Sequence, residues 1–503
     1  MLKSIKESPL YPIANPRSIA FFGASNNIAS MGTTQLMSLK ALGFEGTVYP
    51  IHPKEEQVQG LKAYRSVMDL PDTPDLAVIV LPTSIVPQIL EVCGKKGIRH
   101  AILVSGGFKE VGGHGVDLET EIVEIADRYG MRFLGPNCIG VSNPHHKLNT
   151  TFHPDEGSPG FIGLASQSGS FVTQMFDYLS RLSLGFSTAF SVGNEANLDI
   201  VDCMEYLGAC PHTKVIALYI EGIKRGRAFF ETARSIIPHK PIVALYVGGS
   251  ETGKRAGLSH TGALAGPDLL YDGAFRQSVV IRARSVTELF DFSWVLGSLP
   301  TPRGNKVVIQ THSGGPGAAA ADSCGSAGLE LPALSKETLE KLAPFVPHTG
   351  SINNPVDLTY TKNPVDYFSE IPQVLLEEKN ADILLMYFLM PSHIVKLSLE
   401  QMGFLEGQVI EQTTKLISAQ VESIARLIET YGKPFVGYTF RSLEEQFIRE
   451  LLERGVPVFP DPERAVRAIK ALVKYADLRE NFSTAGMKLK AKGKLTHGKH
   501  IPK

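Results

Sequence analysis

Short apolar runs that end in glycine- or serine-rich turns constrain the fold of this chain most strongly. In the first part of the chain they are Ser18–Phe22, Thr47–Ile51, Leu76–Leu81 and Ala101–Val104, and helical patterns follow the first and the third. A strand that is apolar along its whole length is buried on both faces, which is typical of a parallel sheet covered by helices. The sequence therefore predicts an α/β fold built on parallel sheets.

The same alternation begins again twice, at Phe161–Ala165 and at Lys306–Gln310. A length of 503 residues accommodates roughly three domains. We predict domains over residues 1–153, 154–300 and 301–478. The last expected helix covers residues 462–475. Because the lysine- and glycine-rich segment 479–503 has little apolar surface to bury, we expect it to be a basic, disordered tail.

The second and third predicted domains contain matching stretches. Ser166–Gly169 and Thr311–Gly314 each follow an apolar strand directly and share a serine followed by a glycine. Further along, Val192–Ile200 is similar to Ser351–Thr359. This pattern indicates an internal duplication, and two related folds with a ligand at the carboxyl ends of their strands.

Composition excludes several classes of protein. A formal net charge of −1 argues against nucleic acid as the main partner. The five cysteines show no metal-type spacing, so we expect a reduced, cytoplasmic protein without a metal site. The longest apolar run, Ile383–Met390, is too short to span a bilayer. Residues 1–20 lack the apolar segment of a signal peptide, so we expect no membrane association.

The first predicted domain has ligand-binding features at its strand ends. Gly23-Ala24-Ser25 follows the first strand but does not form the glycine fingerprint of dinucleotide-binding proteins. The second strand is followed by Lys54, where an NAD site would have an acidic residue, and a lysine suits an additional phosphate. Turns at Pro82, Ser105 and Asn137 follow later strands. Together they favour a phosphate-rich nucleotide, with a surface lysine and routine turns as the alternative.

Two turns are suited to binding phosphate. Small hydroxyl residues and glycines stand at predicted helix starts, where free N–H groups and the helix dipole attract anions. Serine also caps helices for structural reasons alone, which stays the alternative. The candidate phosphate-binding residues are Ser166, Gln167, Ser168, Gly169, Ser313, Gly314 and Gly315.

One histidine and one glutamate are candidates for chemistry. His260 lies in a loop made almost entirely of small residues, Gly257–Gly266, and glycine lets such a backbone bend and approach a phosphate closely. Glu221 ends an apolar strand and could stabilise a cationic or phosphorylated imidazole. An incidental surface histidine and a solvated glutamate at the sheet rim are the alternatives.

Taken together, these stretches resemble the α-type portion of ADP-forming (NDP-forming) acyl-CoA synthetases, relatives of succinyl-CoA synthetase. The most specific is Ser259–Gly266, which is similar to the phosphohistidine loop of the family. Four others support it: Gly135–Gly140, Ser166–Gly169, Ser191–Asn194 and Tyr219–Gly222. The resemblance covers the chain to about residue 475.

The resemblance implies a coenzyme A-binding Rossmann-like domain followed by two flavodoxin-like ligase domains. It implies that His260 is phosphorylated transiently and that Glu221 steadies it. It also implies that Gly23, Ser25, Lys54 and Pro82 line the coenzyme A site, to which the strand-end turns add Ser105 and Asn137.

The family's ATP-grasp module, which handles ATP or ADP with Mg²⁺, has no counterpart after residue 475. The resemblance therefore implies a separate β subunit in an α2β2 heterotetramer. The substrates implied are a small carboxylic acid or its acyl-CoA, and inorganic phosphate. The sequence does not reveal the acyl group.

Two other functions stay open at this point. The first is a non-catalytic regulator that binds coenzyme A or acyl-CoA and has kept the fold, which the missing ATP-grasp module favours. The second is an NAD-dependent oxidoreductase, which Lys54 and the absent glycine fingerprint disfavour.

Overall fold

The computed structural model describes residues 4–153, 158–253, 266–359, 363, 365–390 and 392–496. The chain divides into two compact units, residues 1–293 and 294–503. The first unit holds two large sheets and the second unit holds one. All three consist mainly of parallel strands, which confirms the predicted α/β class.

The first sheet has five parallel strands in the order β2-β1-β5-β6-β7. Their bounds are β1 Ser18–Phe22, β2 Thr47–Ile51, β5 Leu76–Ile79, β6 His100–Leu103 and β7 Arg132–Leu134. A two-stranded hairpin, β3 Gln57–Val58 and β4 Leu61–Lys62, follows β2. β1 lies between β2 and β5, so the order in which strands are added to the sheet reverses beside β1. Such sheets bind ligands at the point where the strand order reverses.

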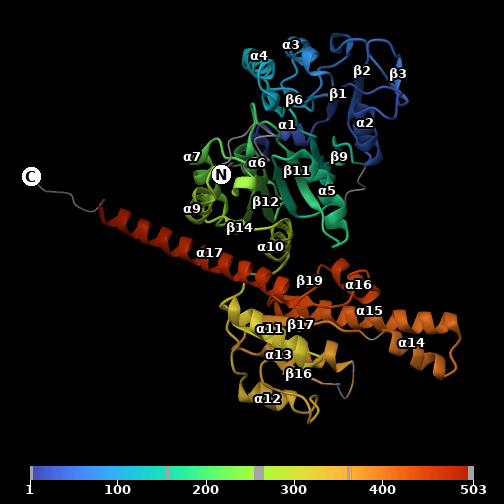
Figure 1. Cartoon of the computed structure of the whole chain (residues 1–503), viewed down its shortest axis with the longest axis vertical. Coiled ribbons are helices and arrows are strands. Elements are labelled where there is room, and N and C mark those ends of the chain that lie inside the picture. Colours follow the sequence, from blue (N-terminus) through green and yellow to red (C-terminus); the bar gives the residue numbers. More distant parts are fainter. Residues whose placement is uncertain are drawn as a thin grey trace, which may run out of the picture. The chain divides into compact units, whose positions relative to one another are not determined.

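Helices cover both faces of the first sheet. α3 and α4 lie side by side (Figure 1) and bury a core that includes Phe108, Ile122 and Phe133. The helices are α1 Tyr11–Ala14, α2 Met31–Ala41, α3 Val86–Lys96 and α4 His114–Tyr129. The 3₁₀ turns are η1 Ile5–Glu7, η2 Val67–Asp69, η3 Thr83–Ile85, η4 Lys109–Val111 and η5 Pro144–His146. β5, β6 and β7 are thus joined by crossovers on one face, and α2 crosses on the other.

The second sheet has seven strands in the order β14-β13-β12-β10-β11-β8-β9. The parallel strands are β10 Ile162–Ser166, β11 Phe186–Ser191, β12 Val215–Ile220, β13 Ile242–Tyr246 and β14 Ile281–Ala283. β8 Val141–Asn143 and β9 Leu148–Asn149 extend it as an antiparallel hairpin. Residues 141–149 thus belong to the second sheet, although we predicted them in the first domain. A short hairpin needs no crossover helix, so the strand–helix alternation does not reveal it.

The helices of the second sheet also lie in two layers. α6, α7 and α9 contact one another in sequence, while aromatic rings of α5 and α10 meet at Phe171 and Phe290. Their bounds are α5 Gly169–Ser180, α6 Ile200–Ala209, α7 Gly226–Ile236, α9 Asp268–Ser278 and α10 Val286–Ser298. Both sides of the buried strands are therefore shielded from water.

The sheet of the second unit has the order β16-β15-β17-β18-β19. Its strands are β15 Val307–Thr311, β16 Val356–Asp357, β17 Ile383–Tyr387, β18 Phe435–Tyr438 and β19 Val458–Phe459. In both units the first strand of the repeat is flanked by the second strand on one side and by the third, fourth and fifth on the other. The first sheet has this order too, so the order is that of the α/β class, and the internal duplication stays a prediction from the matching stretches.

The second unit is rich in helix. Its helices are α11 Gly314–Ser326, α12 Lys336–Leu342, η6 Asp366–Phe368, α13 Glu370–Glu377, α14 Ser392–Gln401, α15 Glu406–Tyr431, α16 Gln446–Glu453 and α17 Pro462–Thr496. α14 runs beside the first half of α15 (Figure 1). α17 continues through residues 479–496, part of the segment for which we expected a disordered tail. Their alanines, leucines and lysines favour helix enough to outweigh Gly486 and Gly493.

A turn after β11 joins the two sheets of the first unit. Asn194 N donates to Pro136 O at 2.9 Å, and Leu198 N donates to Phe133 O at 3.2 Å. Gly193 has a φ of +57°, and a Cβ atom there would lie 2.2 Å from Pro136 O. The segment therefore continues the hydrogen bonding of β7 only because residue 193 has no side chain.

We predict that Gly193→Ala lowers the free energy of unfolding of the first unit by about 1–3 kcal/mol, through left-handed strain and the clash with Pro136. Urea unfolding followed by circular dichroism measures this loss. Gly226→Ala is the control, since a Cβ at Gly226 meets nothing within 4 Å. Equal stability of the two variants would contradict this packing.

Candidate active site

The candidate coenzyme A residues follow successive strands of the first sheet. Gly23 and Ser25 come after β1, Lys54 after β2 and Pro82 after β5, while Ser105 and Asn137 follow β6 and β7. Parallel pairing brings these strand ends to one edge of the sheet. The structure therefore collects all six predicted residues at the ligand-binding edge of an α/β sheet.

The turn after β1 requires glycine. A Cβ atom at Gly23 would lie 1.9 Å from Val80 O, and one at Gly32 would lie 2.3 Å from Gly23 O. The start of α2 therefore lies directly against the turn. The buried Thr33 hydroxyl accepts a bond from Ser25 N and donates one to Ser25 O, both at 3.0 Å. This rigid turn at a helix start is suited to a diphosphate group.

Ser105 and Asn137 organise this edge through contacts within the protein. Ser105 Oγ bonds both the N–H and the carbonyl oxygen of Leu81, which fixes the residue before Pro82. Asn137 N donates to Ser105 O at 2.8 Å, and Asn137 Nδ2 donates to Asn194 Oδ1 at 3.3 Å. Asn137 thus connects the edge of the first sheet to the turn after β11.

The two candidate phosphate turns have the same local geometry. Ser166 Oγ donates to Ser168 O at 2.8 Å and accepts from Ser168 N at 3.1 Å. Thr311 Oγ1 makes the same two bonds with Ser313, at 2.8 and 3.3 Å. Neither Ser168 nor Ser313 caps its helix with its side chain. The hydroxyl of Ser166 or Thr311 thus closes its turn. The serine at the N-cap does not bond the first N–H groups of α5 or α11 with its side chain.

The three glycines of these turns differ in their surroundings. A Cβ at Gly169 would lie 2.8 Å from Ile139, and one at Gly314 would lie 3.3 Å from Asp357 Oδ2. A Cβ at Gly315 would meet nothing within 4 Å. Gly169 is therefore needed for packing, whereas Gly315 opens the start of α11 to solvent.

The side-chain amide of Gln167 bonds the protein backbone. Its Oε1 accepts from the N–H groups of Glu221 and Gly222, and its Nε2 donates to Gly222 O at 2.7 Å. We predicted Gln167 as a phosphate ligand, but its amide is occupied by the backbone after β12. Gln167 therefore positions Glu221 by joining the turn after β10 to the turn after β12.

Lys224 connects the turn after β12 to the turn after β11. Its Nζ donates to the carbonyl oxygens of Asn194 and Glu195, at 2.6 and 2.9 Å. The Asn194 amide in turn donates to Glu110 and Glu119 of the first sheet's domain. A continuous set of hydrogen bonds therefore runs from the first sheet's edge to the turn that carries Glu221.

Glu195 is a buried carboxyl group below this edge. It is 6% exposed, has a φ of +51°, and accepts a bond from Ile200 N at 2.9 Å. Burial is the main cause that raises its pKa to about 7, and the nearby Lys224 charge and a hydrogen bond from Gln167 act in the opposite direction. Keeping the Glu195 carboxylate ionised in this buried position lowers the stability of the fold.

Glu221 lies at the carboxyl end of β12, next to the end of β13. Ile220 pairs with Tyr246, and Val247 N donates to Ile220 O at 2.9 Å. Burial, with the negative charge of Glu221, raises the pKa of Tyr219 to about 12. The chain leaving β13 leads to His260, which lies outside the described residues together with the rest of 254–265.

The described residues on either side of this segment lie close together. Tyr246 Oη donates to Gly266 O at 2.8 Å, and the rings of Tyr246 and Tyr271 stack with centroids 3.5 Å apart. Gly249 lies against Asp268, whose carboxylate pairs with Arg282. Both ends of the segment that contains His260 are therefore fixed beside β13, on the same edge as Glu221.

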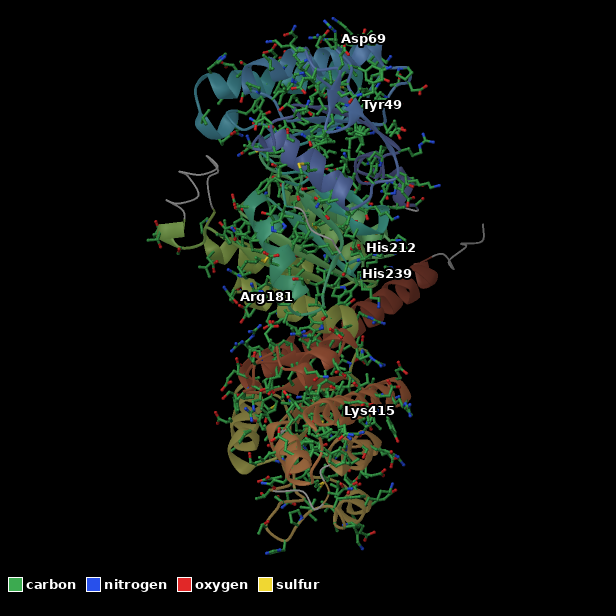
Figure 2. The ribbon with its side chains drawn as sticks, turned by 90° about the vertical axis from the view of Figure 1, so that its right-hand side faces the viewer. Tyr49, Asp69, Arg181, His212, His239 and Lys415 are labelled. Atoms are coloured by element: carbon green, nitrogen blue, oxygen red, sulfur yellow. The ribbon has the colours of Figure 1, made fainter. Side chains whose placement is uncertain are left out.

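Two described histidines of this domain lie at the other edge. His212 and His239, labelled in Figure 2, precede β12 and β13, so they stand at the amino ends of strands whose carboxyl ends lead to Glu221 and residue 254. His212 is exposed and stacks on His145 with centroids 3.9 Å apart. Neither lies at the edge that carries Glu221.

Family models match three successive stretches of the chain. Residues 17–144 match a CoA binding domain, 159–296 a succinyl-CoA ligase like flavodoxin domain, and 307–415 a Ligase-CoA domain. The α subunit of acetate–CoA ligase [ADP-forming] II from Pyrococcus furiosus is 39% identical over 92% of this chain and 97% of that protein. The α subunit of ligase I from the same organism is 37% identical over 93% of this chain and 98% of its own length.

The chain belongs to the family of ADP-forming acyl-CoA synthetases. A solved structure named dinucleotide forming acetyl-coenzyme A synthetase 1, from Ca. Korarchaeum cryptofilum, has a TM-score of 0.84 and 32% identity. The match covers 95% of this chain and 99% of the chain in that structure. This family consists of acid–thiol ligases, so membership removes the oxidoreductase alternative.

Three residues at the strand ends of the second sheet are absent from the predicted site residues. Asn194 lies in a stretch quoted for the resemblance, but its bonds to Glu110 and Glu119 join residues far apart in the chain. Lys224 follows β12 closely enough to have been noticed as a strand-end lysine. Glu195 has an ordinary sequence context, and only its burial singles it out.

Other features of the described residues lie away from this edge. A cavity of about 640 Å³ lies at the amino ends of β17 and β18, and Asp382 and Lys433 contribute to its lining. Among the described residues, no group of three or more histidine, cysteine or acidic side chains could hold a metal ion. None of the described helices has a stretch apolar and long enough to cross a bilayer.

We predict that the stability of the Glu195→Gln variant, relative to that of the wild type, increases as pH rises. The folded-state pKa near 7 exceeds the ordinary 4.5, so the carboxyl group destabilises the fold increasingly between these values, and the full cost is present above pH 7. Relative to the wild type, the variant should gain up to about 3 kcal/mol between pH 4.5 and pH 8.

Urea unfolding at a series of pH values measures this difference. Glu205→Gln, at a half-buried position on α6, is the matched control and should shift by less than about 0.5 kcal/mol. A constant difference between wild type and Glu195→Gln across this range would contradict the buried, ionisable state of Glu195.

Proposed function

We propose that the chain is the α-type subunit of an ADP-forming acyl-CoA synthetase. It interconverts acyl-CoA, ADP and phosphate with a carboxylic acid, coenzyme A and ATP, through an acyl phosphate and a phosphohistidine. The observation that carries the proposal is the position of Glu221 at the end of β12, beside the end of β13 from which the chain leads to His260. A regulator that only binds acyl-CoA has no need of this pair.

Coenzyme A binds at the edge of the first sheet. The glycine-only contact at Gly23 and the start of α2 accept its diphosphate group, with Ser25 in the same rigid turn. The exposed Lys54 binds an additional phosphate. Pro82 and Asn137 contact the extended arm of the cofactor, and Ser105 holds the turn before Pro82 in place.

Phosphate binds at the start of α5, where Ser168 leaves backbone N–H groups available, and the start of α11 offers a turn of the same kind at Ser313. In the direction that consumes acyl-CoA, a phosphate oxygen attacks the thioester carbon and the carbon–sulfur bond breaks. The products are an acyl phosphate and the thiolate of coenzyme A, which takes up a proton. Gly315, where a Cβ atom would meet nothing within 4 Å, leaves the backbone at the start of α11 open to a phosphate.

His260 takes the phosphoryl group in the next step. A neutral ring nitrogen attacks phosphorus, the bond from phosphorus to the acyl oxygen breaks, and the carboxylate leaves. Glu221 accepts a hydrogen bond from the other ring nitrogen and stabilises the cationic phosphoimidazole. Gln167 keeps Glu221 in position by holding its backbone N–H. Dividing the transfer into two steps preserves the energy of the acyl phosphate for ATP formation.

The final transfer needs a nucleotide site on another polypeptide. The Pyrococcus furiosus relatives are named as α subunits, which implies a β subunit. This chain spans 63% of the length of acetate–CoA ligase I from Archaeoglobus fulgidus, so that relative is longer. The partner is an ATP-grasp subunit that binds ADP or ATP with Mg²⁺, and the assembly is an α2β2 heterotetramer.

Labelling with acetyl [³²P]phosphate tests the phosphohistidine. We expect the wild-type chain to acquire label that is stable in base and labile in acid, and peptide mapping should locate it at His260. His260→Asn should acquire less than about 1% of this label, because asparagine offers no nucleophilic nitrogen. If coenzyme A binds but the wild-type chain remains unlabelled, both alone and with its partner, the chain is a regulator.

A separate prediction concerns the additional phosphate of coenzyme A. Lys54→Met should weaken coenzyme A binding about tenfold, the loss of one charge-assisted phosphate contact. Isothermal titration with 3′-dephospho-coenzyme A is the control, since the wild type and the variant should bind it equally. An equal loss for both ligands would place Lys54 elsewhere in the site.

A further inference from the structure

The cavity of about 640 Å³ in the second unit lies at the amino ends of β17 and β18. Its walls come from four segments: residues 301–303 before β15, the start of α12, the turn from α13 to β17, and the turn from α15 to β18. A volume of about 300–1,000 Å³ is typical of sites that bind small organic molecules. The predicted coenzyme A and phosphate residues follow the carboxyl ends of strands, so this cavity lies at the opposite strand ends from them.

The acidic side chains that line this cavity already have partners within the protein. Each carboxylate accepts at least one hydrogen bond or ion pair: Glu337 from Lys341, Glu377 from Lys341 and Tyr431, Glu378 from Ser335 N and Asn380 N, and Asp382 from Lys306 N. Glu378 is buried, and both of its backbone donors lie 2.8 Å away. These carboxylates therefore do not require a bound cation.

The basic side chains of the cavity have fewer partners. Arg303 and Lys379 are exposed, and neither bonds another residue in the part of the chain that the structure describes. Lys433 is half-buried and donates to Glu378 O at 2.5 Å. Burial is the main cause that lowers the pKa of Lys433; Asp382 and Glu378 act against it, and the positive charge of Arg303 acts with it. Arg303 and Lys433 thus lie close enough to repel each other, and an anion beside them would offset this repulsion.

We propose that this cavity binds a small organic anion, whose carboxylate or phosphate group pairs with Arg303 in the positive field of Lys379 and Lys433. A guanidinium group suits either head group, because its N–H donors can bond two oxygen atoms at once. Pro302, Leu376 and Pro434 offer apolar surface to the body of the ligand. The proposal goes beyond the proposed function and does not depend on it.

The position of Arg303 in the chain gives this ligand a structural effect. Arg303 belongs to the segment that leads from α10 into β15, and α10 begins in the first unit and ends in the second. The neighbouring Thr301 Oγ1 accepts a hydrogen bond from Arg479 of α17 at 3.3 Å. An anion bound to Arg303 would join this connecting segment to the turns that follow α13 and α15.

Isothermal titration of the whole chain with phthalate and with phenyl phosphate tests the site, and the two probes distinguish a carboxylate from a phosphate ligand. At least one should bind the wild type with a Kd of about 1 mM or below. The double variant Arg303→Met, Lys379→Met should bind it about tenfold more weakly or less, because two positive charges are lost. Lys336→Met, which removes a charge of α12 outside the cavity, is the matched control and should bind as the wild type does.

Phenylglyoxal modification, followed by mass spectrometry of peptides, locates the bound probe. Saturating probe should slow the modification of Arg303 several-fold, while Arg181, an exposed arginine of the first unit (Figure 2), should react at an unchanged rate. Urea unfolding should show equal stability for the double variant and the wild type, since neither side chain bonds a described residue. The proposal is wrong if neither probe binds, or if the double variant binds as tightly as the wild type.

Discussion

The amide of Gln167 is the contact on which the candidate catalytic edge depends. It closes the gap between the turns after β10 and β12 by satisfying two backbone N–H groups and one carbonyl oxygen. Groups left unpaired at a partly buried strand end would destabilise the turn by about 1–3 kcal/mol each. Parallel strands bring their carboxyl ends to one edge, and this side chain holds the backbone of Glu221 there.

The predicted internal duplication explains how one chain supplies two similar phosphate turns. Ser166 and Thr311 close their turns with the same pair of bonds, although the residues that follow, Gln167 and His312, differ. The conserved element is a hydroxyl group that bends the backbone and leaves a helix start uncapped. The residue at the second position differs between the two turns, and in the first unit this residue, Gln167, bonds the backbone of Glu221.

Sequence reasoning reached the strands, their edges and most turn residues, because apolar runs and glycine turns are local signals. It placed Gly23, Lys54 and Pro82 correctly at strand ends, since a strand's end is visible in the chain itself. It did not reach Gln167's role or the burial of Glu195, because both depend on contacts between residues far apart in the chain, such as Gln167 and Glu221, which are 54 residues apart. The hairpin of β8 and β9 escaped for a similar reason, since its partner β11 follows more than 40 residues later.

The account rests on a phosphoryl group reaching His260 from phosphate and acyl-CoA, before any nucleotide takes part. Incubating the chain, with its partner subunit, with acetyl-CoA and [³²P]phosphate in the absence of ADP and ATP tests this directly. We expect acid-labile label on His260, released acetate and free thiol in equal amounts, and no label when either acetyl-CoA or phosphate is omitted. Label that appears only after ATP is added, with acetyl-CoA left intact, would contradict the account.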